Sequence, residues 1–146
     1  MIVFAVVVTV GKVAMGDIFD ENRYAHDPRN DFMNWAIITH GAYDYAADAR
    51  GYSLGFAAEY FDPAGWAIRA GRFAMPKESN GLPLDPSLTR QHGDQVELEI
   101  NHGLFGRPGT VRFLAFRNKA GMGSFRASLD LAAATGTTPE IGRAHV

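Results

Sequence analysis

Residues 52–75 read YSLGFAAEYF-DPAG-WAIRAGRFAM, and this stretch decides the fold class. In residues 52–61, Tyr, Leu, Phe, Ala and Tyr alternate with Ser, Gly, Ala and Glu, which is the period-two pattern of a strand. Residues 62–65 place Pro and Gly where a type I turn accepts them. The stretch therefore predicts two antiparallel strands joined by a short turn.

The same alternation continues toward the C-terminus. Residues 95–104 show it most regularly, because Val96, Leu98 and Ile100 share one face while Gln, Glu, Glu and Asn share the other. Residues 110–118 form a less regular strand. A β-branched run over residues 2–13 predicts another strand at the N-terminus. A short helix is expected near residues 124–134. These elements together predict an all-β protein of five or six antiparallel strands.

The connections between these strands alternate in length. Short turns are expected at 62–65 and 105–109, and long connections at 14–50, at 76–93 and after 118. Strands of about ten residues joined in this way are typical of outer-membrane barrels, with short periplasmic turns and long extracellular loops. Aromatic residues beside the short turns match an interfacial girdle. The alternative is a soluble β-sandwich that binds carbohydrate, because one solvated face gives the same alternation.

Composition excludes several classes of protein. The chain has no cysteine, so disulfides and thiolate metal sites are excluded. A formal net charge of −2 argues against a nucleic-acid partner. The longest apolar stretch, residues 2–10, is shorter than the ~20 residues of a spanning helix. It also lacks the preceding basic residues and the cleavage site of a signal peptide, which is the other interpretation of this stretch.

Seven blocks in a fixed order carry a family resemblance. They are residues 10–20 (VGKVAMGDIFD), 22–29 (NRYAHDPR), 32–36 (FMNWA), 41–52 (GAYDYAADARGY), 70–76 (AGRFAMP), 80–85 (NGLPLD) and 106–118 (GRPGTVRFLAFRN). From about residue 8 to residue 125 the chain resembles the bacterial carbohydrate porins of the OprB family. The resemblance implies an outer-membrane barrel that passes small sugars by diffusion, without chemistry and without a cofactor. A barrel for other small solutes is a third interpretation.

The resemblance also implies that the chain is incomplete. The smallest single-chain bacterial barrels have eight strands, so five or six strands predict an open, curved sheet with unpaired edges. We assign residues 1–140 to a partial porin barrel embedded in the lipid bilayer. Residues 141–146 (IGRAHV) resemble a translated sequencing adapter and are interpreted as an artefact. Whether the full barrel is a monomer or a homo-oligomer stays open.

In a porin, long loops that fold inward shape the constriction of a water-filled lumen. The prime candidate is the charged segment 17–31, followed by the aromatic residues after it. Guanidinium forks and carboxylates can bind sugar hydroxyls, and aromatic rings can stack on apolar sugar faces. The candidates for the constriction and for sugar contact are Arg23, Tyr24, His26, Asp27, Arg29, Asp31 and Trp35. The alternative is a loop whose charges only pair with each other.

Charged residues on the polar strand faces are candidates for the lumen wall. They are Glu59, Arg69, Glu97, Glu99 and Arg112. Cross-strand ion pairing is the simpler expectation for them, and direct contact with solute is the alternative. Arg72 falls out of phase with Arg69, which predicts a place near the extracellular rim.

Signals for an enzyme are weak, and we expect none. Glu97 and Glu99 share a face like a glycosidase pair, but acids two residues apart on one strand usually form a wet face. Gly11-Lys12 lacks the spacing of a phosphate-binding loop, and residues 17–21 lack that of a calcium loop. The histidines show no metal-ligand spacing, and no nucleophile elbow is present.

Overall fold

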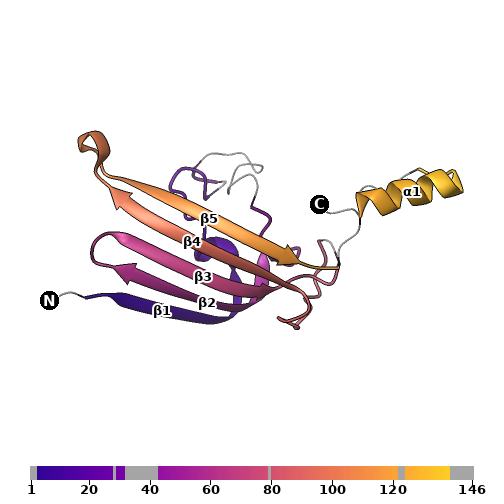
Figure 1. The fold of residues 1–146 in the computed structure, drawn as a ribbon, viewed down its shortest axis with the longest axis horizontal. Helices are drawn as coiled ribbons and strands as arrows, with labels where there is room; N and C mark the ends of the chain where they lie inside the picture. The colour runs from indigo at the N-terminus through magenta and orange to yellow at the C-terminus, as the bar shows by residue number, and fades with distance from the viewer. Residues whose placement is uncertain (1–2, 28, 32–42, 79, 122–123, 139–146) are drawn as a thin grey trace.

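The computed structural model describes residues 3–27, 29–31, 43–78, 80–121 and 124–138 of the chain. Five antiparallel strands form one open sheet whose order follows the sequence (Figure 1). They are β1 (Ala5–Ala14), β2 (Tyr52–Asp62), β3 (Trp66–Ala74), β4 (His92–His102) and β5 (Gly109–Lys119). Strands β1 and β5 lie at the edges and pair with no further described strand. The predicted open antiparallel sheet is therefore confirmed.

The two ends of the sheet differ in how they connect the strands. At one end, which we call the turn end, β2 meets β3 through residues 63–65, and β4 meets β5 through the 3-10 turn η3 (Leu104–Gly106). The Asp62 carboxylate accepts the Ala64 amide at 2.8 Å, and Gly65 has the positive φ of 89° that completes this turn. The long connections meet at the opposite end, which we call the loop end. The predicted alternation of short and long connections is confirmed.

One face of the sheet, the apolar face, is exposed. Strand register aligns Val8, Ala58, Ala70, Val96 and Ala115 across all five strands. The next row holds Val6, Tyr60, Ile68, Leu98 and Phe113. Val8 is 66% exposed and Phe113 is 61% exposed. No second sheet covers this face in the described part of the chain, as a sandwich would require.

Aromatic side chains border the apolar face at the turn end. The Tyr60 and Trp66 ring centroids lie 5.3 Å apart, and Phe4 stacks on Tyr60 at 6.0 Å. Phe61 points to the other face, where the Arg69 guanidinium lies 5.3 Å from its ring. Phe105 is fully exposed in the turn. Aromatic rings at the edge of an apolar band are the arrangement expected at a membrane–water interface.

The opposite face, the polar face, is covered by the connection between β1 and β2 (Figure 1). This connection begins with the 3-10 turn η1 (Met15–Asp17). Phe19 is fully buried and meets Phe73 of β3 edge to face, with ring centroids 6.3 Å apart. The buried cluster consists of Met15, Ile18, Phe19, Tyr43 and Ala46 from the connection and Ala57, Phe73 and Met75 from the sheet side. Burial of a side chain the size of Phe19 stabilises the docked connection by roughly 1.5–3 kcal/mol.

The connection is anchored at the loop end by Asp48. Its carboxylate accepts the Lys12 ammonium at 2.9 Å and the amides of Arg50 and Tyr52. The Lys12 hydrogen bond is the main reason that the pKa of Asp48 lies below its usual value. Burial raises the pKa of the phenol of Tyr43, which belongs to the same connection.

The predicted short helix is confirmed as α1 (Phe125–Thr135), which follows β5. Ser124 caps its first turn by accepting the Ala127 amide, and Gly136 ends it in the left-handed conformation with φ 66°. No helix among the described residues is long and apolar enough to cross a membrane. Two predictions concern residues that the structure does not describe. They are the role of Trp35 in the constriction and the interpretation of residues 141–146 as an artefact.

Candidate functional site

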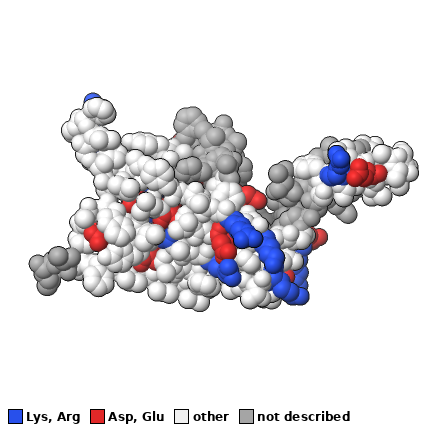
Figure 2. Space-filling model, viewed as in Figure 1, with Lys and Arg blue, Asp and Glu red and all other residues white. Residues whose placement is uncertain are grey.

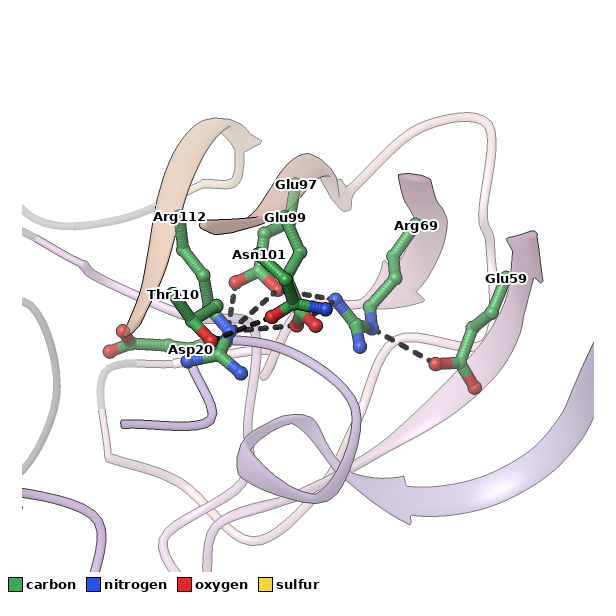
Figure 3. A network of polar contacts seen from close by, with 8 residues as sticks. All are labelled: Asp20, Glu59, Arg69, Glu97, Glu99, Asn101, Thr110 and Arg112. Atoms are coloured by element: carbon green, nitrogen blue, oxygen red, sulfur yellow. Dashed lines mark hydrogen bonds and ion pairs between the residues drawn. The ribbon is translucent and has the colours of Figure 1, made fainter. Parts of the chain in front are cut away.

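A row of ionised side chains crosses the polar face from β2 to β5 (Figure 3). Arg69 of β3 is its centre, because its register partners are Glu59 on one side and Glu97 on the other. The guanidinium reaches Glu59, Glu97 and Glu99, each at 3.0 Å. Arg112 of β5 continues the row with an ion pair to Glu99 at 2.9 Å. The five predicted wall residues thus form one network, as cross-strand pairing predicts.

The network is buried because the β1–β2 connection lies over it. Glu97 is fully buried and Arg69 is 4% exposed. The backbone amide of Asp20, in the connection, donates to the Glu97 carboxylate at 2.6 Å. Three carboxylates face two guanidiniums in the row, and the Asp20 amide supplies a further donor to the excess negative charge. This hydrogen bond fixes the point along β4 at which the connection crosses the sheet.

A cleft of about 820 Å³ opens beside this crossing, between the connection and the turn end of β4 and β5. Six residues of the connection form one side, and six from the β4–β5 hairpin form the other. They are Glu21, Asn22, Arg23, Tyr24, His26 and Asp31, opposite Asn101, His102, Pro108, Gly109, Thr110 and Arg112. The Thr110 hydroxyl donates to the Asn101 side chain at 2.7 Å. The cleft thus offers cationic donors, carboxylate acceptors and an aromatic ring in one space.

The far side of the cleft is shaped by a turn within the connection. The Asp27 amide donates to the Asp31 carboxylate at 3.1 Å, and the Asp31 amide donates to the Asp27 carbonyl at 2.8 Å. The Asp27 carboxylate also accepts the Arg29 amide at 2.8 Å and the Asn30 side chain at 2.6 Å. Hydrogen bonding, first of all from the Arg29 amide, lowers the pKa of Asp27, so it stays ionised near neutral pH.

The structure brings most of the predicted constriction residues together, but in different roles. Arg23, Tyr24, His26 and Asp31 line the cleft, and the Arg23 guanidinium lies 5.9 Å from the Tyr24 ring centroid. Asp27 is engaged in the turn. Arg29 is exposed and does not line the cleft. The alternative prediction, a loop whose charges only pair with each other, thus applies to the hydrogen bonds around Asp27. The side chains that line the cleft are accessible to a solute.

Some cleft residues were not predicted as site residues. The sequence places Asn101 and His102 only in the strand 95–104, Pro108 in the short turn 105–109 and Thr110 in the following strand. Their place in the cleft follows from the docking of the connection across β4 and β5, which no local pattern in the sequence signals. The alternation does put Asn101 on the polar face with Glu97 and Glu99, and this is the one signal that could have identified it.

The donors and acceptors of the cleft suit a neutral polyhydroxylated molecule. Hydroxyl groups both donate and accept, so neighbouring guanidinium, carboxylate and amide groups can all bind them. Among the described residues, no group of His, Cys, Asp or Glu side chains could hold a metal ion.

Comparison with known proteins adds one finding to this geometry. A family model described as carbohydrate-selective porin, OprB family, matches residues 4–145, which extends beyond the blocks that carry the resemblance. Searches of curated proteins and of solved structures returned no significant match. A match over nearly the whole chain, together with the open antiparallel sheet, assigns the family: the chain belongs to the carbohydrate-selective porins of the OprB family.

Proposed function

We propose that this chain forms part of the wall of a bacterial outer-membrane channel through which small carbohydrates diffuse passively. One observation carries the proposal: the two faces of the sheet have opposite character. The exposed apolar face suits lipid, and the charged polar face suits a water-filled lumen. The five strands in the described part of the chain fall short of the eight in the smallest single-chain bacterial barrels, and in this proposal additional strands complete the channel.

The β1–β2 connection is the element that narrows the channel. It starts and ends at the loop end, which corresponds to the extracellular side because the short turns are periplasmic. From there it folds along the polar face as far as the cleft at the turn end. A connection held inside the lumen by a buried aromatic cluster and by the Asp20–Glu97 hydrogen bond sets the free cross-section.

Carbohydrate is the solute that the cleft supports best. Arg23 and Asp31 present a donor and an acceptor on the same side, and the exposed Tyr24 ring can stack on a sugar face. A porin for small acids would instead favour a strongly cationic lumen. The cleft here is mixed in charge, with Glu21 and Asp31 among its carboxylates and Arg23 and Arg112 among its guanidiniums, which favours a neutral solute.

The test is single-channel conductance of the full-length porin that contains this chain, titrated with glucose and with acetate. We expect saturable block by glucose and little block by acetate. Tyr24→Ala should weaken the glucose block by about fivefold, because stacking on an aromatic ring contributes on the order of 1 kcal/mol. Phe105→Ala removes another exposed aromatic ring, which lies in the β4–β5 turn outside the cleft, and serves as the control.

The outcomes separate the two parts of the proposal. Conductance without glucose block would keep the channel and contradict the carbohydrate assignment. Equal glucose block in the native protein and the Tyr24 variant would contradict the assignment of the cleft as the sugar-binding site. An absence of conductance in a folded, inserted protein would contradict the channel itself.

A further inference from the structure

Cationic side chains gather on the apolar face at the loop end of the sheet (Figure 2). Arg72 of β3 and Arg117 of β5 flank Asp94 of β4 in the strand register, and Lys119 lies opposite His92 one step further along. All of these positions share the phase of the apolar rows, so their side chains leave the sheet on the apolar face. Arg72, whose position is out of phase with Arg69, therefore belongs to a group of basic residues with Arg117 and Lys119, which we call the basic rim.

The rim has more cations than its carboxylate neutralises. The Asp94 carboxylate accepts hydrogen bonds from Arg72 Nε at 2.6 Å and Arg72 Nη2 at 2.9 Å, and lies 3.5 Å from His92 Nε2. Arg117 and Lys119 are exposed and make no ion pair within the described part of the chain. Two cations thus remain available for an external anion, next to an Arg72–Asp94 pair that holds the site in shape.

An apolar groove of about 250 Å³ lies on the same face, close to the rim. It is lined by Val10, Leu54 and Phe56 of the sheet and by Pro86 and Leu88 of the β3–β4 connection. Phe56 is the register partner of Arg72, and the Arg72 guanidinium donates to the Leu88 carbonyl at 3.4 Å. The groove and the basic rim are therefore parts of one surface.

We propose that this surface binds one anionic lipid of the outer leaflet, with its phosphate on Arg117 and Lys119, beside the Arg72–Asp94 pair, and an acyl chain in the groove. A cationic rim attracts a lipid phosphate at the headgroup level, and the apolar groove beside it, in the same strand rows, accepts part of the attached chain. A free phosphate ion satisfies the rim but leaves the groove empty. The combination identifies an amphiphile, and the loop end places it in the outer leaflet.

The experiment measures binding of lipid A, which carries phosphates and acyl chains, to the full-length porin in a neutral detergent. The test variant is Arg117→Gln/Lys119→Gln, which leaves the Arg72–Asp94 pair intact. The control variant is Arg107→Gln/Arg126→Gln, which removes the same charge from the exposed β4–β5 turn and from α1. We expect the test variant to bind lipid A about 30-fold more weakly and the control to bind like the native protein.

Two further arms identify the ligand chemistry. Dephosphorylated lipid A should bind the native protein no better than lipid A binds the test variant, and Leu88→Ser should weaken lipid A binding while leaving the rim cations in place. Three results would each overturn the proposal. The first is equal affinity of the native protein and the test variant for lipid A. The second is displacement of lipid A by inorganic phosphate at the same concentration as lipid A, and the third is an unchanged affinity for lipid A in Leu88→Ser. Channel conductance is measured separately and should be unchanged in the test variant, so a failure of the proposed transport function remains distinguishable.

Discussion

The buried guanidinium of Arg69 should be the most costly single charge to remove from this sheet. It is 4% exposed and makes hydrogen bonds to Glu59, Glu97 and Glu99. Arg69→Met would leave three carboxylates on the polar face with Arg112 as their remaining guanidinium in the row. Removal of one partner from a buried ion pair costs about 3–5 kcal/mol, because the remaining charge stays buried without compensation.

Denaturant unfolding of the full-length porin in lipid vesicles, followed by tryptophan fluorescence, measures this loss. Arg69→Lys should lose less, about 1–3 kcal/mol, because an ammonium keeps the charge but cannot reproduce the planar fork. Arg107→Gln, in the exposed turn, is the control and should change the free energy of unfolding by less than about 0.5 kcal/mol.

A double-mutant cycle then tests the cause. If the loss comes from the uncompensated Glu97 charge, Arg69→Met combined with Glu97→Gln should recover part of it. A single Arg69→Met variant as stable as the native protein would refute the reasoning, because it would show that the network is solvated and that the β1–β2 connection does not bury it.

Three further predictions concern the connection and the sheet. Phe19→Ala should cost about 3–5 kcal/mol by opening a cavity against Phe73 and should increase single-channel conductance by loosening the connection; unchanged conductance would contradict a constriction role. Because the folded-state pKa of Asp48 is lowered, its stabilising contact with Lys12 is fully present above the unfolded pKa of about 3.9 and is lost as the pH falls through the folded value. Proteolysis of the connection should therefore rise in acid, and Asp48→Asn should show the acid-like susceptibility already at neutral pH. Gly55→Ala should cost about 1–3 kcal/mol in denaturant unfolding, because a methyl group there would overlap the β3 backbone and the Phe73 ring.

The strands and their faces could be predicted from the sequence. Alternation is a local property, since successive side chains of a strand point to opposite faces whatever the partner strand is. Val96, Leu98 and Ile100 therefore separate from Glu97 and Glu99 without knowledge of the fold, and the cross-strand ion pairs follow from register. The short turn at 62–65 was equally predictable, because Pro63 fixes its own φ and Gly65 accepts the positive φ that the turn requires.

The cleft could be predicted only as a collection of residues. The segment 17–31 was identified by its charge, but its sequence does not distinguish Asp27, which holds a turn, from Arg23, which faces the cleft. That difference depends on where the connection docks. The docking rests on the contact of Phe19 with Phe73 and on the hydrogen bond from the Asp20 amide to Glu97, two residues that are 77 positions apart.

The sequence by itself determined the strands, the polar and apolar faces, the alternation of short turns and long connections, and the family resemblance. Only the tertiary structure decided that the first long connection lies along the polar face, that it buries the Arg69 network, and that a cleft opens at its edge. The physical reason is the range of the interactions. Strand alternation and turn geometry act between neighbours in the chain, whereas docking of a loop depends on contacts between segments that only the folded sheet brings together.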